Sequence, residues 1–340
     1  MIRCNVISKE MRRSHGPVIH LELPTALKLQ RAGHIKMDEI LDRLPGKADL
    51  TSYLFRDGFL NNGGLKVAWV QDYDKDGGAE LSNYVVVAAG EKLGLDIVSV
   101  TPSGFRLDPL VGAEVIVVNN LFNFGDVNYQ KILKCLYECG KPYVKYEHDH
   151  REITERKSQA ARLFENSSLN VFISPRQMKN HIDAFPSIHG RVFPLAIDVK
   201  RFVPVPGIER KKNSVFVPGF DKCREETVKY IIEHPEYEYT LVGLVDMPNN
   251  PNVKGVRKIE PDSMPNEYCR HEILLHLPTK VGGGERVIFE GALCGCRVVA
   301  NENAAHTSWK EFWDWEDATT LREKLARAPY DFWREVCRLA

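Results

Sequence analysis

Residues 272–301 read EILLHLPTKVGGGERVIFEGALCGCRVVAN. The pattern predicts an apolar strand, a glycine loop at Gly282–Gly284, a helix that begins near Arg286 and a second strand. Glycines let the backbone approach an anion closely, and free N–H groups at a helix start point toward it. The stretch therefore predicts a phosphate site. The alternative is a tight turn followed by an exposed helix.

The same alternation of strands and helices extends outward from this stretch. Upstream of the quoted stretch, strands at 213–219 and 238–244 and a helix at 225–235 belong with it to one set of elements, the second in the chain. A first set has strands at 66–71, 96–102, 113–120, 141–148 and 169–174 and helices at 81–94, 128–140, 154–167 and 175–185. Continuous apolar strands separated by helices indicate parallel sheets covered on both faces. The sequence therefore predicts an α/β protein with two Rossmann-like domains.

The segments outside these two sets predict the domain limits. The proline- and charge-rich stretch 200–212 is typical of a linker. Residues 21–44 have helical spacing, and we interpret 1–64 as an N-terminal extension that packs on the first domain. Two helical patterns, 317–327 and 329–339, close the chain. The expected domains are 65–197 and 198–325, with 326–340 as a final helix that crosses back to the first domain.

Composition limits the classes of function. The chain has 340 residues, with 46 basic and 46 acidic side chains and a formal net charge of +0. This balance removes the simplest argument for a nucleic-acid or anionic-membrane partner. We expect neither a secretory signal nor a transmembrane segment, because no apolar run approaches the ~20 residues that span a bilayer. The scattered cysteines indicate reduced thiols and a cytoplasmic protein.

The quoted stretch resembles the donor-binding signature of retaining GT-B glycosyltransferases of the group 1, family 4-like kind, roughly E-G-F-G-x-x-x-x-E-A-x-x-x-G-x-P-V-V-A. Glu290 falls on the second glutamate, which in that family holds the donor ribose. The first glutamate, which in the family contacts the donor sugar, falls on Gly282 and is absent. Glu285, three residues further on, is the candidate substitute.

Three other segments resemble the same family in the same order, so the resemblance covers about residues 66–315. They are the glycine-rich loop and helix at 77–94, the interdomain segment 193–204 and the strand and loop at 215–226. The resemblance implies two domains that face each other across a cleft. It also implies a donor site made of Gly77, Gly78, Lys222, Arg224, Gly283, Gly284, Glu285, Arg286, Val287 and Glu290.

His148 ends a predicted strand where the family often carries a histidine that contacts the donor sugar or the acceptor. His150 is the rival for this catalytic role, and Asp149 is expected to orient either ring. The alternative interpretation is a set of polar residues that faces solvent at a strand end.

Two patterns imitate metal sites. Asp72, Asp74 and Asp76 copy the first half of an EF-hand loop, but position twelve is Asn83 and a strand precedes the loop. His271 and His276 are one residue too far apart for the zinc HExxH motif and lie on a predicted strand. We expect no metal ligands in either pattern.

The resemblance implies a hexosyltransferase-type enzyme that uses a nucleoside diphosphate sugar, with retention and with no cofactor or obligatory metal. The acceptor stays open among a glycan, a lipid, a protein and a modified nucleobase. The loss of the acid at Gly282 favours one alternative, a non-catalytic GT-B-like protein that binds a nucleotide-sugar. A nucleotide-sugar epimerase and a glycosyltransferase that acts on modified DNA bases are the others, the latter because of the basic run at 210–212.

Overall fold

A computed structural model describes residues 2–6, 18–21, 35–36, 64–72, 77–155, 157–243, 250–308 and 317–340. The chain divides into two compact units, residues 1–64 with 92–94, and residues 65–91 with 95–340. In the first unit, β1 (Ile2–Val6) pairs antiparallel with β2 (Val18–Leu21) and β3 (Ile35–Lys36). The predicted helix at 21–44 is wrong at Leu21 and at Ile35–Lys36, which are strands, and its other residues lie outside the described ones.

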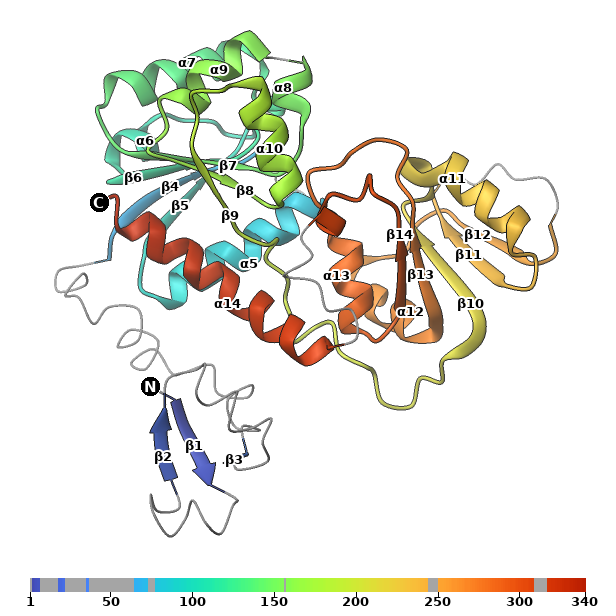
Figure 1. The fold of residues 1–340 in the computed structure, drawn as a ribbon. Coiled ribbons are helices and arrows are strands. Elements are labelled where there is room, and N and C mark those ends of the chain that lie inside the picture. The colour runs from blue at the N-terminus through green and yellow to red at the C-terminus, as the bar shows by residue number, and fades with distance from the viewer. Residues whose placement is uncertain are drawn as a thin grey trace. The chain divides into compact units, whose positions relative to one another are not determined.

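The first sheet of the second unit is entirely parallel, with the order β5-β4-β6-β7-β8-β9 (Figure 1). Its strands are β4 (Lys66–Val70), β5 (Asp96–Val100), β6 (Val115–Val118), β7 (Tyr143–Glu147), β8 (Leu169–Phe172) and β9 (Gly190–Val192). Its helices are α5 (Gly78–Lys92), α6 (Asp108–Gly112), α7 (Gly125–Glu138), α8 (Arg151–Glu155), α9 (Lys157–Glu165) and α10 (Pro175–Ala184). A 3-10 turn, η1, covers Phe122–Phe124.

Alternate residues of β4 explain why both faces of this sheet are covered. Ala68 and Val70 belong to the core under α6, α7 and α9, which includes Leu110 and Ile132. Trp69 points to the other face, where its ring lies 5.7 Å from that of Trp333. Because side chains alternate along a strand, a strand apolar at every position is buried on both faces.

The second sheet is also parallel, with the order β12-β11-β10-β13-β14. Its strands are β10 (Lys211–Pro218), β11 (Glu238–Val242), β12 (Val253–Val256), β13 (His271–His276) and β14 (Arg297–Ala300). Its helices are α11 (Phe220–Glu233), α12 (Met264–Arg270) and α13 (Arg286–Leu293), with the 3-10 turns η2 (Pro261–Ser263) and η3 (Ala305–Ser308). Lys211 and Lys212, assigned to the linker from sequence, begin β10.

The chain closes with one helix, α14 (Ala318–Cys337), where the sequence predicted two pieces. Pro329 lies inside this helix and removes one backbone donor without ending it. The Arg322 guanidinium donates to the carbonyls of Phe202 and Leu293, at 3.0 and 3.1 Å. Further along, the Trp333 indole donates to Val86 O of α5 at 2.6 Å, and Figure 1 shows the two helices side by side.

Within the described residues, no helix is both long enough and apolar enough to span a bilayer.

Trp333→Ala should lower the free energy of unfolding by about 3–5 kcal/mol, because it empties a fully buried aromatic site and removes the bond to Val86. Urea unfolding monitored by circular dichroism measures this. Thr319→Ala, at an exposed position of the same helix, is the control and should change stability by less than about 0.5 kcal/mol. Equal unfolding curves for both variants would contradict this account of α14.

Candidate active site

The glycine loop lies at the topological switch point of the second sheet. The chain enters this sheet at β10, then builds β11 and β12 on one side and β13 and β14 on the other. In open parallel sheets, ligands bind outside the carboxyl ends of the strands where the order reverses. Here that position lies between β10, which leads into α11 at Gly219, and β13, which leads into the loop and α13. The two helix starts thus meet beside one ligand position.

The glycines of the loop are required by their surroundings. A Cβ atom on Gly283 would come within 2.5 Å of His148 O and 2.9 Å of Asp149 Cα. A Cβ atom on Gly284 would come within 2.7 Å of His306 Nε2. No side chain fits at 283, so the backbone of the loop lies directly against the residues that follow β7 in the first sheet.

Gly282 leaves space for Glu285. A Cβ atom on Gly282 would overlap the Oε1 atom of Glu285, whose carboxyl group therefore occupies the place of a side chain at 282. Burial raises the pKa of Glu285 to about 7, although backbone N–H groups of Ala305 and His306 and the charge of Lys222 oppose this shift. Its Oε2 atom has no hydrogen-bond partner among the described residues.

Arg286 and Glu290 form a buried ion pair on α13. Glu290 Oε1 accepts from Arg286 Nε at 2.9 Å, and Oε2 accepts from the Tyr268 hydroxyl at 2.9 Å. Arg286 Nη1 also donates to Ser82 Oγ of α5 at 2.8 Å and to Ala196 O at 3.0 Å. Glu290 is only 6% exposed. A carboxylate can accept about four hydrogen bonds, so Glu290 can accept from a further donor besides Arg286 and Tyr268.

The remaining donor-site candidates lie at helix starts. Lys222 is exposed in the first turn of α11, and its backbone oxygen accepts from Thr279 N at 3.2 Å, which joins α11 to the loop after β13. Arg224, two residues further along α11, is also exposed, with its guanidinium 5.4 Å from the Phe220 ring centre. Val287 lies in the first turn of α13.

Gly77 and Gly78, at the start of α5, lie near the second sheet's candidates. A Cβ atom on Gly78 would lie 3.7 Å from Arg286 Cδ, an ordinary contact. A Cβ atom on Gly77 would overlap the carboxyl group of Glu80. The structure therefore brings Gly78 and Arg286 together.

His148 is held by a chain of amides whose orientation is determined by Trp69. The Trp69 indole N–H, which can only donate, bonds to Gln71 Oε1 at 3.0 Å, and that oxygen also accepts from Asn83 Nδ2 at 3.1 Å. Asn83 Oδ1 therefore faces His148 Nε2, at 3.0 Å. Asn119 Nδ2 donates to Val70 O, so Asn119 Oδ1 also faces His148 Nε2, at 3.2 Å.

Two acceptors around Nε2 require that His148 carry its proton there. Burial, with the positive charges of Lys145 and Arg286, lowers the pKa of His148 to about 3, so the ring is neutral at pH 7. Its Nδ1 atom is a buried acceptor with no hydrogen-bond partner among the described residues. His148 can thus accept a hydrogen bond from a hydroxyl group at Nδ1 while its ring stays neutral.

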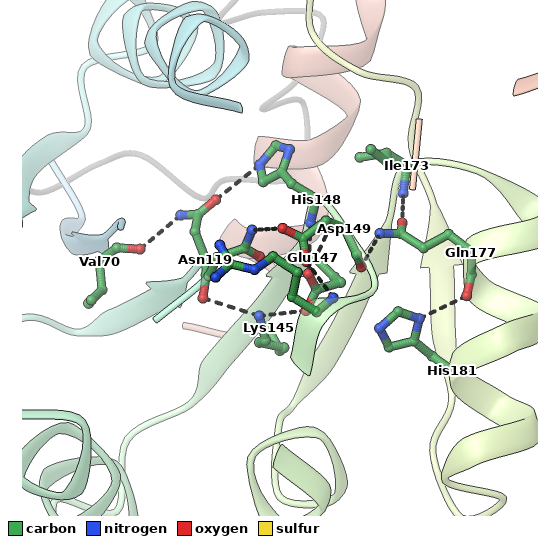
Figure 2. Close-up of polar contacts among 11 residues, drawn as sticks. Val70, Asn119, Lys145, Glu147, His148, Asp149, Ile173, Gln177 and His181 are labelled. Atoms are coloured by element: carbon green, nitrogen blue, oxygen red, sulfur yellow. Dashed lines mark hydrogen bonds and ion pairs between the residues drawn. The ribbon is translucent and has the colours of Figure 1, made fainter. Parts of the chain in front are cut away.

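A buried ion pair supports the end of β7. Lys145 Nζ lies 2.9 Å from Glu147 Oε2, and both side chains are 0% exposed. Lys145 also donates to Asn119 O at 3.1 Å, and Glu147 Oε1 accepts from the backbone N–H groups of His148 and Asp149, each at 3.1 Å. Figure 2 shows Lys145 between Asn119 and Glu147. The pair therefore anchors both residues that touch Gly283.

Asp149 does not orient either histidine ring, contrary to the sequence-based expectation. Its carboxylate accepts from Asn120 Nδ2 at 3.0 Å and from Arg151 N at 2.7 Å, at the start of α8. Burial and the neighbouring charge of Glu147 raise the pKa of Asp149 to about 6. His150 contacts α10, with Nε2 3.1 Å from Asn180 Nδ2 and its ring stacked on His181.

Sequence reasoning missed most of the network around His148. Lys145 and Glu147 gave a signal, because charges two residues apart on an apolar strand share one face and must pair when buried. Asn119 gave another, since it directly follows the strand β6. No local sequence pattern indicates Asn83, which faces His148, or Gln177, whose Nε2 atom donates to Asp149 O at 3.0 Å, because these partners come from other elements.

Of the two metal-like patterns, Asp74 and Asp76 lie outside the described residues. Asp72 Oδ1 accepts from Asn123 N. His271 bonds to Thr240 and Glu267, and His276 lies beside Cys223. In the described part of the chain, no group of three or more His, Cys, Asp or Glu side chains is arranged to hold a metal ion.

The sequence matches no protein-family model and no curated protein. Solved structures do match. A sucrose-phosphate synthase from Thermosynechococcus elongatus is similar with a TM-score of 0.55 and 13% identity, over 81% of this chain and 96% of that one. HepE from Anabaena, in complex with UDP and glucose, is similar with a TM-score of 0.53 and 15% identity, over 81% and 93%.

A third similar structure is an alpha-glucosyltransferase in complex with UDP and a 13-mer DNA that contains an HMU base. Its TM-score is 0.55 at 14% identity, over 81% of this chain and 94% of that one. Identities this low show the fold alone. The two parallel sheets with their helices are the GT-B fold, as predicted from the sequence.

Glu290→Ala should lower the free energy of unfolding by about 3–5 kcal/mol, because it leaves the buried Arg286 guanidinium unpaired. Chemical denaturation measures the change. The matched control is Glu267→Ala, which removes a carboxylate from the partly exposed pair with Arg270 and should cost less than about 1 kcal/mol. A Glu290 variant as stable as the control would show that the pair contributes little.

Glu285→Gln should stabilise the protein at pH 8 more than at pH 5.5. A carboxyl group whose pKa rises from 4.5 to about 7 on folding favours the protonated folded state. Its contribution is present at low pH and is lost as the pH rises through 7, whereas glutamine stays neutral. The melting temperature of the variant relative to wild type, measured at both values, tests this, with the exposed Glu302→Gln as control. A difference that does not grow with pH would contradict the assigned shift.

Proposed function

We propose that this protein is a glycosyltransferase that takes its sugar from a nucleoside diphosphate sugar, with UDP as the first nucleotide to test. The observation that carries the proposal is the glycine loop at the switch point, whose backbone lies against the first sheet beside His148. Complexes with UDP in two structures of similar fold support the choice of nucleotide.

In this proposal the diphosphate binds at the starts of α11 and α13. Backbone N–H groups of Gly283, Gly284 and the first turn of α13 donate to its oxygens, and the exposed side chains of Lys222 and Arg224 near the start of α11 supply positive charge. Such groups stabilise the charge that develops on a leaving diphosphate. Because these cations and dipoles are already present, we propose that no divalent metal is required.

The sugar then lies between the loop and the end of β7. The Nδ1 atom of neutral His148 accepts a hydrogen bond from a sugar hydroxyl, and the carboxyl group of Glu285 contacts the sugar from the loop. Glu285 occupies the place of the acid missing at 282, which supports an enzyme over a non-catalytic binding protein. Retention of configuration is proposed from the sequence resemblance alone.

The ribose contact is proposed for Glu290, with Arg286 holding the carboxylate in place. Four acceptor classes are compatible with this proposal: a glycan, a lipid, a protein and a modified nucleobase. The resemblance in fold to a glucosyltransferase that binds modified DNA keeps the last class in the set.

Wild-type protein should bind UDP in excess EDTA and should slowly release UDP from UDP-glucose or another UDP-sugar. The double variant Lys222→Ala, Arg224→Ala should bind UDP about a hundredfold or more weakly, since each charged contact to a phosphate contributes about 1.5–3 kcal/mol. Calorimetry in EDTA measures affinity, and a coupled assay measures released UDP.

Lys229→Ala is the matched control, because Lys229 is an exposed lysine further along α11, paired with Glu226. It should leave UDP affinity unchanged. Binding of UDP, GDP, ADP and dTDP too weak to detect would reject the proposal. Tight binding without hydrolysis or transfer of any sugar would favour the non-catalytic alternative, and binding restored only by a divalent metal would reject metal independence.

A further inference from the structure

Ser174 links the glycine loop to the first sheet. It lies between β8 and α10, its side chain is fully buried, and its Oγ atom accepts from Gln177 N at 3.1 Å as the N-cap of α10. The same hydroxyl donates to Gly283 O at 2.7 Å. A hydroxyl group has one proton to donate, so Ser174 directs that proton at the loop of the other sheet.

The neighbouring peptides of the loop are held within the second sheet's own elements. Gly282 N donates to Asn303 O at 3.2 Å, and Glu285 N donates to His306 Nδ1 at 3.1 Å. Between them, the N–H groups of Gly283 and Gly284 have no hydrogen-bond partner among the described residues. These two N–H groups are therefore available to an anion.

The hydrogen bond from Ser174 to Gly283 O determines the direction of the Gly284 N–H group. The carbonyl of Gly283 and the N–H of Gly284 belong to one trans peptide, so they point in opposite directions. With Gly283 O directed at α10, the Gly284 N–H is directed away from α10. Glycine has the greatest backbone freedom of all residues, so this orientation needs an external constraint.

We propose that Ser174 is a positioning residue of the diphosphate site: by holding Gly283 O, it aims the Gly284 N–H at a phosphate oxygen. The inference rests on the proposed function, because it takes the diphosphate to bind at this loop. Ser174 itself contacts no ligand, since its hydroxyl is committed to Gly283 and Gln177. Ser174 must therefore affect affinity through the peptide between Gly283 and Gly284. Only ligands with phosphate groups should bind more weakly when its hydroxyl is removed.

The experiment compares UDP with uridine, by calorimetry, on wild type, Ser174→Gly and Ser174→Thr. Glycine removes the bond to Gly283 but is tolerated as an N-cap at a cost of only a few tenths of a kcal/mol. Ser174→Gly should weaken UDP binding about tenfold, as expected for one lost hydrogen bond to a charged group, and should leave uridine binding within about twofold. Ser174→Thr keeps the hydroxyl and should restore UDP affinity.

Other outcomes overturn the inference in distinguishable ways. Unchanged UDP affinity in Ser174→Gly would mean that the peptide is held without the hydroxyl. Equal losses for UDP and uridine would mean that Ser174 only stabilises α10. If Ser174→Gly does not fold, the near-isosteric Ser174→Cys, whose thiol is a weak donor, should show a smaller selective loss for UDP, and no such loss would overturn the inference. Wild type that binds no nucleoside diphosphate would instead reject the proposed function.

Discussion

The contact between the Gly283 backbone and the end of β7 is the constraint on which the candidate site depends. A methyl group at 283 would approach His148 O to 2.5 Å, so the loop can reach this position only without a side chain. The contact brings the N–H groups of the loop beside the residues that follow β7. Glycine residues alone would let the loop adopt other conformations. Hydrogen bonds with Asn303, His306 and Ser174 hold successive peptides of the loop in place.

The other side of this contact is rigid for a different reason. His148 and Asp149 follow a strand whose Lys145 and Glu147 form an ion pair fully removed from water. Such a pair is stable only when its remaining hydrogen-bonding capacity is satisfied. Here the carboxylate of Glu147 accepts the next two backbone N–H groups, and the ammonium of Lys145 donates to Asn119 O. These bonds from the pair thus order the strand end that receives the loop.

The sequence predicted the order of most strands and helices, because apolar runs and glycine breaks are local signals. It predicted the loop at Gly282–Gly284 for the same reason. It missed β12, whose four residues Val253–Val256 include a lysine and a glycine, and it divided α14 at Pro329. The roles of Ser174 and Asn83 could not be predicted, since each depends on a partner far away in the chain. Nor could sequence alone show that Glu285 folds back into the space left at Gly282.

Charge is distributed unevenly across the candidate site, and this distribution suits transfer of a sugar from a diphosphate. The cations Lys222 and Arg224 are exposed near the start of α11, whereas Lys145, on the strand before His148, is buried and paired with Glu147. His148 itself is kept neutral by burial and by the positive charges of Lys145 and Arg286. A diphosphate would therefore meet positive charge and free N–H groups on one side, while the sugar would meet a neutral acceptor on the other. Charge that moves onto the diphosphate as its bond to the sugar breaks would thus move toward the groups already oriented to stabilise it.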